Sequence, residues 1–223
     1  MRENMMNIDN MDRLGVINEL VDKLEVEDYL EIGVFTGYTL DGCNAKNKLG
    51  IDPHPEHYTS GKHQVIGATS DQFFDSLDPK AKFKLIFLDG LHEAHQVRRD
   101  FENSLKHLSK GGAIVLHDVN PPKYEHTTTG IDGCWTGDVY KIAIWMRPMF
   151  PYNYFTVDTD WGVGVYQNGE LADHWFRVFG GDFKGSLPDI AWETFNAGRK
   201  QLLNLISYQE FIKRIDGTIT SSL

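Results

Sequence analysis

The sequence predicts an α/β fold, in which a doubly wound and mainly parallel sheet carries helices on both faces. Three observations support this prediction. Apolar segments of strand length alternate with amphipathic segments of helix length along most of the chain. The stretch 29–40 is typical of a buried strand, a glycine turn and a helix start, the unit at which α/β proteins bind nucleotides. The run 83–90 is apolar apart from Lys84 until it ends in Asp and Gly, as expected of a central parallel strand.

The first part of the chain contains one strand–helix–strand unit, preceded by an amphipathic helix. Apolar residues recur there at helical spacing, so this helix is expected to pack on the sheet. Gly33 and Gly37 bracket the turn after the first strand, where glycine reaches positive φ without penalty and lets a ligand approach the backbone. The elements predicted here are a helix at 12–25, a strand at 29–32, a helix at 36–46 and a strand at 48–52.

The alternation continues through the middle of the chain. Residues 54–61 are loop-like, and Gly111 and Gly112 are expected to stop the longest helix of this part. The predicted elements are a weak strand at 63–68, a short helix at 70–77, a strand at 83–90, a helix over 94–108 and a strand at 113–119.

The pattern breaks at 120–137, a polar segment rich in Gly, Pro and Thr, and loops of this length are usually functional or disordered. Asp138 can cap the helix that follows. The last part should supply an antiparallel pair of strands and a helical C-terminal extension, which is either packed on the domain or a dimer contact. The predicted elements are a helix at 139–147, strands at 152–159 and 161–168, and helices at 192–206 and 207–215.

Composition narrows the classes of partner. The chain has 223 residues, which favours a single domain over 1–223, with a core at about 29–168 and an extension at 169–223. A net charge of −10 disfavours nucleic acid and points to a small-molecule substrate. Cys43 and Cys134 are expected to be free thiols in a reducing compartment, and the cytoplasm is the default. No signal peptide or apolar run of ~20 residues is apparent, so no membrane partner is expected.

One motif identifies a candidate nucleotide pocket. Residues 31–37 follow the pattern Glu-x-Gly-x-x-x-Gly, and Asp52 ends the next strand. A carboxylate at that place can hydrogen-bond both ribose hydroxyls of a nucleoside. This pair resembles the first motifs of the class I S-adenosylmethionine-dependent methyltransferases, whereas the turn spacing disfavours an NAD-dependent oxidoreductase.

The stretch 83–122 extends the resemblance to a branch of small-molecule O-methyltransferases that includes macrolide-sugar and polysaccharide-associated enzymes, with catechol O-methyltransferases as more distant relatives. The resemblance covers about 29–168. It implies a Rossmann-like seven-stranded sheet in the order 3-2-1-4-5-7-6, with strand 7 antiparallel, which agrees with the elements derived above.

The resemblance also implies roles for particular residues. Glu31 would anchor the amino group of the cofactor S-adenosylmethionine, the two glycines would admit its methionine part, and Asp52 would hold its ribose. Thr69 or Ser70 matches the position that meets the adenine edge. The complete set of cofactor-binding candidates is Glu31, Gly33, Phe35, Thr36, Gly37, Asp52, Thr69, Ser70 and Asp89.

Chemistry is expected at the ends of the strands at 83–90 and 113–119. Related metal-dependent enzymes hold a divalent cation such as Mg²⁺ there, and Asp89 and Asp118 match two of its ligands. The third position departs from the family, because Val119 cannot bind a metal and His117 would make a softer site than Mg²⁺ prefers. The metal set is therefore Asp89, His117 and Asp118 if a metal is used at all.

The proton acceptor is His92 or Asp89, since His92 stands close to where relatives carry a second acidic residue and has an ordinary pKa near neutrality. Structural explanations stay open. Asp89 could merely cap a helix, His117 and Asp118 could be a polar strand end, and Trp135 in the long loop could form a lid or only pack.

The sequence thus predicts an O-methyltransferase that acts on a hydroxyl of a small polar acceptor, such as a sugar or sugar nucleotide. The alternatives are a Mg²⁺-dependent, catechol-like aromatic O-methyltransferase and a cofactor-binding subunit without catalysis.

Overall fold

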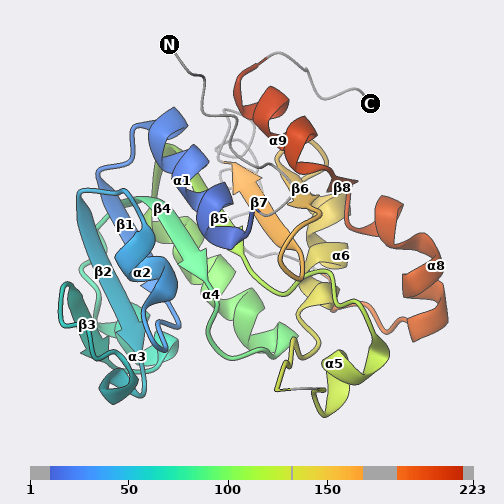
Figure 1. The fold of residues 1–223 in the computed structure, drawn as a ribbon, viewed down its shortest axis with the longest axis horizontal. Helices are drawn as coiled ribbons and strands as arrows, with labels where there is room; N and C mark the ends of the chain where they lie inside the picture. The colour runs from blue at the N-terminus through green and yellow to red at the C-terminus, as the bar shows by residue number, and fades with distance from the viewer. Residues whose placement is uncertain (1–10, 132, 168–184, 218–223) are drawn as a thin grey trace.

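The computed structural model describes residues 11–131, 133–167 and 185–217, and shows one eight-stranded sheet in the order β3-β2-β1-β4-β5-β7-β6-β8 (Figure 1). β7 runs antiparallel to both of its neighbours, whereas the other pairs are parallel. The predicted order is confirmed, and the sheet has one strand more than predicted. The strands are β1 Asp28–Ile32, β2 Asn47–Asp52, β3 Gln64–Gly67, β4 Phe83–Leu88, β5 Leu108–Leu116, β6 Tyr154–Val157, β7 Val163–Gln167 and β8 Leu205–Ile206.

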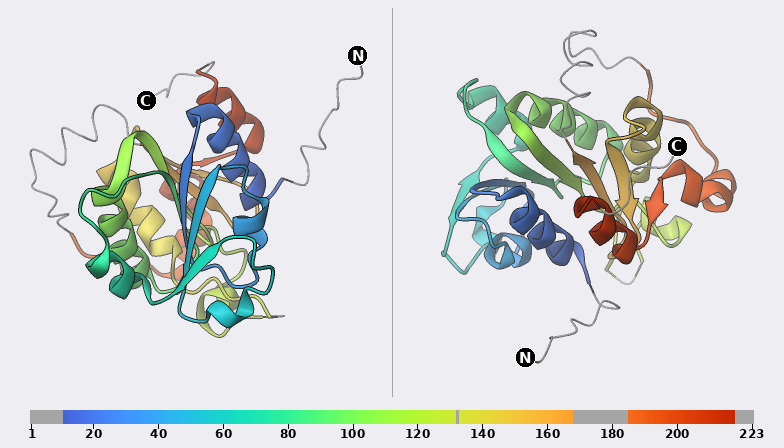
Figure 2. Two further views of the ribbon diagram at one scale, coloured as in Figure 1. Left: turned by 90° about the vertical axis from the view of Figure 1, so that its left-hand side faces the viewer. Right: turned by 90° about the horizontal axis from the view of Figure 1, so that it is seen from above.

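Helices cover both faces of the sheet, as two views at right angles show (Figure 2). One apolar cluster joins α3, α4, α6 and α8 to the sheet, and a second cluster joins α1, α2 and α9 to the other face. The helices of the described chain are α1 Arg13–Leu24, α2 Tyr38–Gly42, α3 Ser70–Ser76, α4 Ala94–His107, α5 Tyr124–Thr128, α6 Tyr140–Met149, α8 Trp192–Leu202 and α9 Tyr208–Ile215, with a 3₁₀ turn at Pro55–His57.

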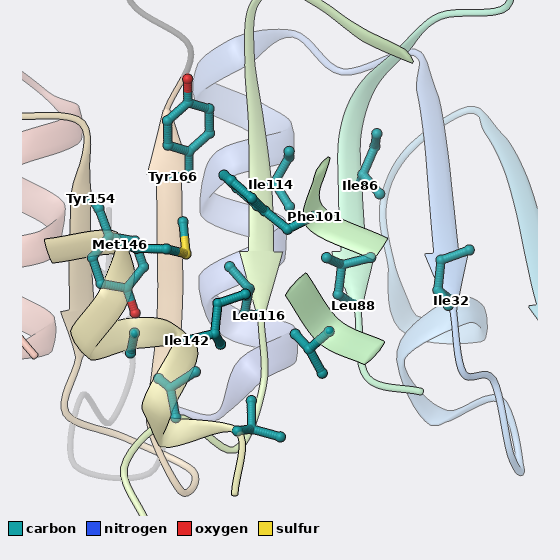
Figure 3. Close-up of a cluster of buried hydrophobic side chains, with 14 of the residues drawn as sticks. Ile32, Ile86, Leu88, Phe101, Ile114, Leu116, Ile142, Met146, Tyr154 and Tyr166 are labelled. Carbon is teal, nitrogen blue, oxygen red and sulfur yellow. The ribbon is translucent and has the colours of Figure 1, made fainter. Parts of the chain in front are cut away.

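Strand residues alternate between the two clusters because successive side chains of a strand point to opposite faces. In β4, Ile86 and Leu88 face α4 and α6, whereas Leu85 and Phe87 face α1. Figure 3 shows Phe101 of α4 beside Ile114 of β5 in the first cluster. The continuous apolar run at 85–88 is thus explained, since this part of the central strand is buried on both faces.

The helix after the glycine turn is shorter than the predicted 36–46. α2 covers Tyr38–Gly42 only, and Cys43 is already extended. A Cβ on Gly42 would lie 2.5 Å from a Leu14 methyl carbon, so α1 packs closely against the end of α2. The position of the turn itself is confirmed.

Gly111 and Gly112 do not stop α4, which ends at His107 and passes directly into β5. The pairing of β4 with β5 shifts register at this point, Gly111 has a φ of 67°, and a Cβ on Gly112 would lie 2.5 Å from the Lys84 carbonyl oxygen. The two glycines therefore permit an irregular strand start, which is a second common use of glycine in sheets.

Asp138 does not cap α6, whose N-cap residue is Val139. Its carboxylate instead accepts a 2.7 Å hydrogen bond from the backbone N–H of Ala94, at the start of α4, and pairs with Lys141 at 3.0 Å. A helix N-terminus has unpaired N–H groups that any nearby acceptor can satisfy, including one far away in sequence.

The end of the chain differs from the prediction at one place. β6 and β7 form the predicted antiparallel pair, but the predicted helix at 192–206 ends at Leu202, and Asn204 takes a positive φ of 51°. Leu205 and Ile206 then pair in parallel with β6 as an eighth strand. Phe195 and Phe211 are fully buried, so the described part of the C-terminal extension is packed on the domain. Residues 169–184 and the polar N-terminal stretch 1–10 lie outside the described residues.

Within the described ranges, no helix combines the length and the apolarity that crossing a bilayer would require.

Candidate active site

A cavity of about 830 Å³ opens at the carboxyl ends of β1, β2, β4 and β5, the edge at which doubly wound sheets bind ligands. Eight of the nine predicted cofactor-binding residues line it, together with His92, His117 and Asp118. Gly37 is not part of the lining, yet its φ is 86° and a Cβ there would lie 2.4 Å from the Tyr58 ring. The structure therefore places these predicted residues around one cavity.

Gly33 is required by the backbone that surrounds it. Its N–H donates to the Ile51 carbonyl at 2.8 Å and its φ is 88°. A Cβ on this residue would lie 2.1 Å from the carbonyl oxygen of Asp89, so the turn after β1 lies directly against the end of β4. Any side chain at this position would separate the two halves of the site.

Asp52 stabilises the glycine turn through hydrogen bonds to its backbone. Its Oδ2 accepts hydrogen bonds from the backbone N–H groups of Val34 at 2.9 Å and Phe35 at 2.8 Å, and its Oδ1 accepts one from His54 at 2.8 Å. A carboxylate has about four acceptor positions, so these three bonds leave little capacity for a ligand. The predicted ribose contact remains a prediction, and the structure adds a backbone role that the sequence did not reveal.

Glu31 is buried beneath the turn and accepts a 2.6 Å hydrogen bond from the hydroxyl of Tyr29. Burial raises its pKa to about 8 although the Tyr29 hydrogen bond favours the charged form. This carboxyl group is therefore mostly neutral at pH 7 in the free protein.

Thr69 and Ser70 begin α3 at the far side of the cavity. Thr69 forms a reciprocal capping box with Gln72, and Ser70 accepts a 3.1 Å hydrogen bond from the side chain of Gln96 in α4. Both residues line the cavity, as expected of an adenine-binding position, and their hydrogen bonds to Gln72 and Gln96 join elements of the fold.

At the ends of β4 and β5, the imidazoles of His92 and His117 both approach one carboxylate oxygen of Asp89. Oδ1 of Asp89 lies 3.4 Å from Nε2 of His92 and 3.2 Å from Nδ1 of His117. Burial on its own would raise the pKa of Asp89, but the two imidazoles outweigh it and hold that pKa below its usual range. Burial opposes the charged form of His92, whereas Asp89 and Asp118 favour it, and the net effect is a raised pKa.

The long loop at 120–137 closes over His92. Nδ1 of His92 donates to the Trp135 carbonyl at 2.7 Å, if this nitrogen carries the proton, and the two rings stack with centroids 5.6 Å apart. A Cβ on Gly137 would lie 1.7 Å from the His92 carbonyl oxygen, so the loop returns directly against this residue. Trp135 is therefore a wall of the site and also contacts the histidine.

One group of side chains has the arrangement of a metal site. Ligand atoms of Asp89, His92 and Asp118 all lie within 4.8 Å of one another. His117, which the sequence suggested as the third ligand, is outside this group. Its Nε2 lies 2.8 Å from the Asp160 carbonyl oxygen. Burial on its own would lower the pKa of His117, but Asp89, Asp118 and Asp160 outweigh burial and raise that pKa above its usual value. The structure therefore groups His92, and not His117, with Asp89 and Asp118, while the metal set of Asp89, His117 and Asp118 remains a prediction.

Arg13 and Asp160 were not singled out from the sequence. Arg13, at the start of α1, lines the cavity and pairs through Nη1 with Asp160 at 2.7 Å. Asp160 and Trp161 form the turn between β6 and β7 with consecutive positive φ values of 42° and 64°. Neither residue stands in a recognisable motif, since only the folded chain brings the first helix and the last hairpin to this edge.

Comparisons with known proteins agree with this geometry. Residues 30–119 match a family described as a methyltransferase domain. A protein of Acanthamoeba polyphaga mimivirus, R132, is 27% identical over 140 residues, which cover 52% of this chain and 63% of that protein, so the chain spans less than two thirds of this relative.

Solved structures show the same fold. A Staphylococcus aureus protein provisionally assigned as a caffeoyl-CoA O-methyltransferase aligns with a TM-score of 0.51 and 18% identity, over 71% of this chain and 85% of that one. The Podospora anserina methyltransferase PaMTH1 with bound S-adenosylhomocysteine aligns with a TM-score of 0.50 and 16% identity, over 71% of this chain and 78% of that one.

Proposed function

We propose that this chain transfers a methyl group from S-adenosylmethionine to a hydroxyl of a small polar acceptor, such as a sugar or sugar nucleotide. The match of residues 30–119 to a methyltransferase domain supports this proposal. The observation that supports this most directly is the single cavity that joins the glycine turn and Asp52 to the cluster of Asp89 and His92. One half of the cavity suits a nucleoside, and the other half suits a proton transfer.

The described residues fit the cofactor. The cavity volume of about 830 Å³ lies within the range of small-molecule sites, roughly 300–1,000 Å³. Gly33 leaves room for close approach at the junction of β1 and β4. Glu31 is a buried acid that has no cation at bonding distance among the residues that the structure describes, so it suits the amino group of a bound amino-acid moiety. When bound, S-adenosylmethionine supplies the electrophilic methyl group.

The chain's own contribution is to orient the acceptor and to take its proton. His92 is placed for the second task, because its ring is held from one side by the Trp135 carbonyl and from the other by Asp89. Asp89 and Asp118 stabilise the imidazolium that forms when Nε2 receives the proton. Trp135, 42% exposed, offers a flat apolar surface at the rim against which the acceptor can be positioned.

A metal-dependent reaction is the second candidate, favoured by the convergence of Asp89, His92 and Asp118. Two carboxylates and one imidazole form a donor set that fits a divalent transition ion better than Mg²⁺. A cation held by these residues would lower the pKa of an acceptor hydroxyl. In that case His92 would be a ligand, and the proton would leave to solvent or another base.

Two measurements test the proposal. Calorimetry should show that the purified protein binds S-adenosylhomocysteine more tightly than NAD, and tight binding of NAD alone would contradict it. Mass spectrometry should then show an added methyl group on sugars or sugar nucleotides incubated with S-adenosylmethionine. A protein that binds the cofactor but methylates no hydroxyl acceptor from sugar and catechol panels would instead be the cofactor-binding subunit without catalysis.

A further inference from the structure

Arg13 differs from the other residues that line the cavity, because it is the only arginine or lysine among them within the described chain. The lining also contains Glu31, Asp52, Asp71, Asp89 and Asp118. A ligand that carries a carboxylate would meet repulsion from these acids unless a permanent cation is placed for it. We propose that Arg13 recognises the carboxylate of the methionine part of S-adenosylmethionine. This inference rests on the proposed function.

The location of Arg13 supports this role. Its guanidinium lies 5.3 Å from the centroid of the Tyr38 ring, and Tyr38 begins α2 directly after the glycine turn. Arg13 is also close enough to Glu31 to favour the charged form of that carboxyl group. Glu31 and Arg13 thus place a carboxyl group and a cation at one end of the cavity, which matches the amino and carboxylate groups of an amino acid.

The guanidinium is held in place before any ligand arrives. One oxygen of Asp160, Oδ2, accepts both the backbone N–H of Arg13 at 3.0 Å and its Nη1 at 2.7 Å. Asp12 caps α1 through Gly15 and also accepts a hydrogen bond from the Tyr38 hydroxyl. Because these contacts fix the side chain, a bound carboxylate would lose little affinity to ordering of the arginine.

The donors of Arg13 are incompletely used. Its buried Nε finds no hydrogen-bond acceptor among the described residues, and its nearest carboxylate oxygen, Oδ2 of Asp89, lies 3.8 Å away. A buried donor without a partner costs stability unless a ligand supplies the acceptor. Guanidinium groups bind carboxylates through two donors at once, so the group suits a ligand carboxylate better than a lysine would.

The test compares two cofactors that differ only in this carboxylate. Calorimetry on the whole protein should show that S-adenosylmethionine binds about 10- to 100-fold more tightly than decarboxylated S-adenosylmethionine, as expected for a charge-assisted bidentate contact. In Arg13→Met, which keeps much of the side-chain volume, the two ligands should bind with equal affinity. Arg13→Lys should retain part of the preference. Lys23→Met, in the same helix and paired with Asp216 at the surface, is the matched control and should keep the wild-type preference.

The outcomes separate the inference from the function on which it rests. Equal binding of the two ligands by the wild-type protein would overturn the role of Arg13 without the need for any variant, while leaving the methyltransferase proposal intact. An undiminished preference in folded Arg13→Met would do the same. If the wild-type protein binds neither ligand nor 5′-deoxy-5′-methylthioadenosine, the proposed function fails as well.

Discussion

Nε2 of His92 lies 3.4 Å from Oδ1 of Asp89, three residues earlier in the chain. His117 approaches the same oxygen from β5, so one carboxylate serves two imidazoles. Two adjacent imidazolium ions would repel each other, and the negative charges of Asp118 and Asp160 offset that repulsion. The charges of these histidines and aspartates therefore compensate one another. Removal of one of these side chains would leave a buried charge without its partner.

His92→Gln should reduce the rate of methyl transfer by about 10²- to 10⁴-fold, the usual contribution of a positioned general base. Glutamine can keep a hydrogen bond to the Trp135 carbonyl but cannot take up a proton. Steady-state kinetics should show the loss in kcat, while calorimetry should show little change in the affinity for S-adenosylhomocysteine. His95→Gln, one turn away on the exposed face of α4, is the control. Full activity in His92→Gln would show that another group accepts the proton.

Chelation tests the metal alternative. If Asp89, His92 and Asp118 hold an essential cation, EDTA should abolish turnover and Mn²⁺ or Zn²⁺ should restore it more effectively than Mg²⁺. If His92 is the base, turnover should survive the chelator. The experiment is decisive because the two roles of His92 exclude each other.

Glu31 should make stability depend on pH. Its pKa is about 8 in the folded chain and near 4.5 in an unfolded one, so the folded state holds a proton that the unfolded state has lost between these values. Its contribution is fully present below pH 4.5 and declines as the pH rises through 8. Urea unfolding of Glu31→Gln should therefore lose less stability than the wild type between pH 5 and about 8.5. Parallel curves for the two proteins would contradict the raised pKa.

Asp138→Ala should destabilise the fold by about 1 kcal/mol, because the first N–H of α4 loses its acceptor. Asp138→Asn retains an acceptor oxygen and should recover most of this loss, which separates the cap from the ion pair with Lys141. Thermal unfolding measures both variants. Asp75 is exposed in α3, and the Asp75→Ala variant shows how much thermal stability changes when a surface carboxylate without this capping role is removed.

The sequence predicted the fold well where local patterns carry the information. The apolar run of β4 and the spacing of α4 reflect burial that each segment specifies by itself. The predictions were wrong where contacts between distant parts of the chain determine how an element begins, ends or pairs. Asp138 precedes α6 but caps α4. Gly111 and Gly112 lie in the irregular start of the pairing between β4 and β5. Leu205 follows a helical pattern in the sequence but pairs with β6 as a strand.

The same distinction applies to the site. Glu31, Gly33 and Asp52 belong to one motif and lie together as expected. Arg13 and Asp160 are separated by 147 positions, and no local pattern marks their ion pair. His92 was recognised as a base candidate, but its place beside Asp118 depends on how the loop after β4 folds back.

Phe35 tests whether an unfavourable backbone conformation is retained because it helps to bind the cofactor. It has a φ of 47°, a conformation that costs a residue with a bulky side chain about 1–2 kcal/mol, and 66% of it is exposed. Asn tolerates this conformation, so Phe35→Asn should raise the free energy of unfolding by about 1 kcal/mol and the Tm by roughly 2–4 °C. The backbone N–H that Asp52 accepts is unaffected by this change. Phe35 lines the cavity, so affinity for S-adenosylhomocysteine should fall in the same variant.

The control is Tyr152→Asn, which replaces another exposed aromatic residue whose φ is not positive and should leave both quantities near their wild-type values. A less stable Phe35→Asn would mean that the ring contributes more packing, for example against His57 at 5.5 Å, than its conformation costs. A more stable variant with unchanged affinity would mean that the strain serves the turn and not the ligand. Only a gain in stability combined with a loss of affinity shows that this position favours cofactor binding over stability.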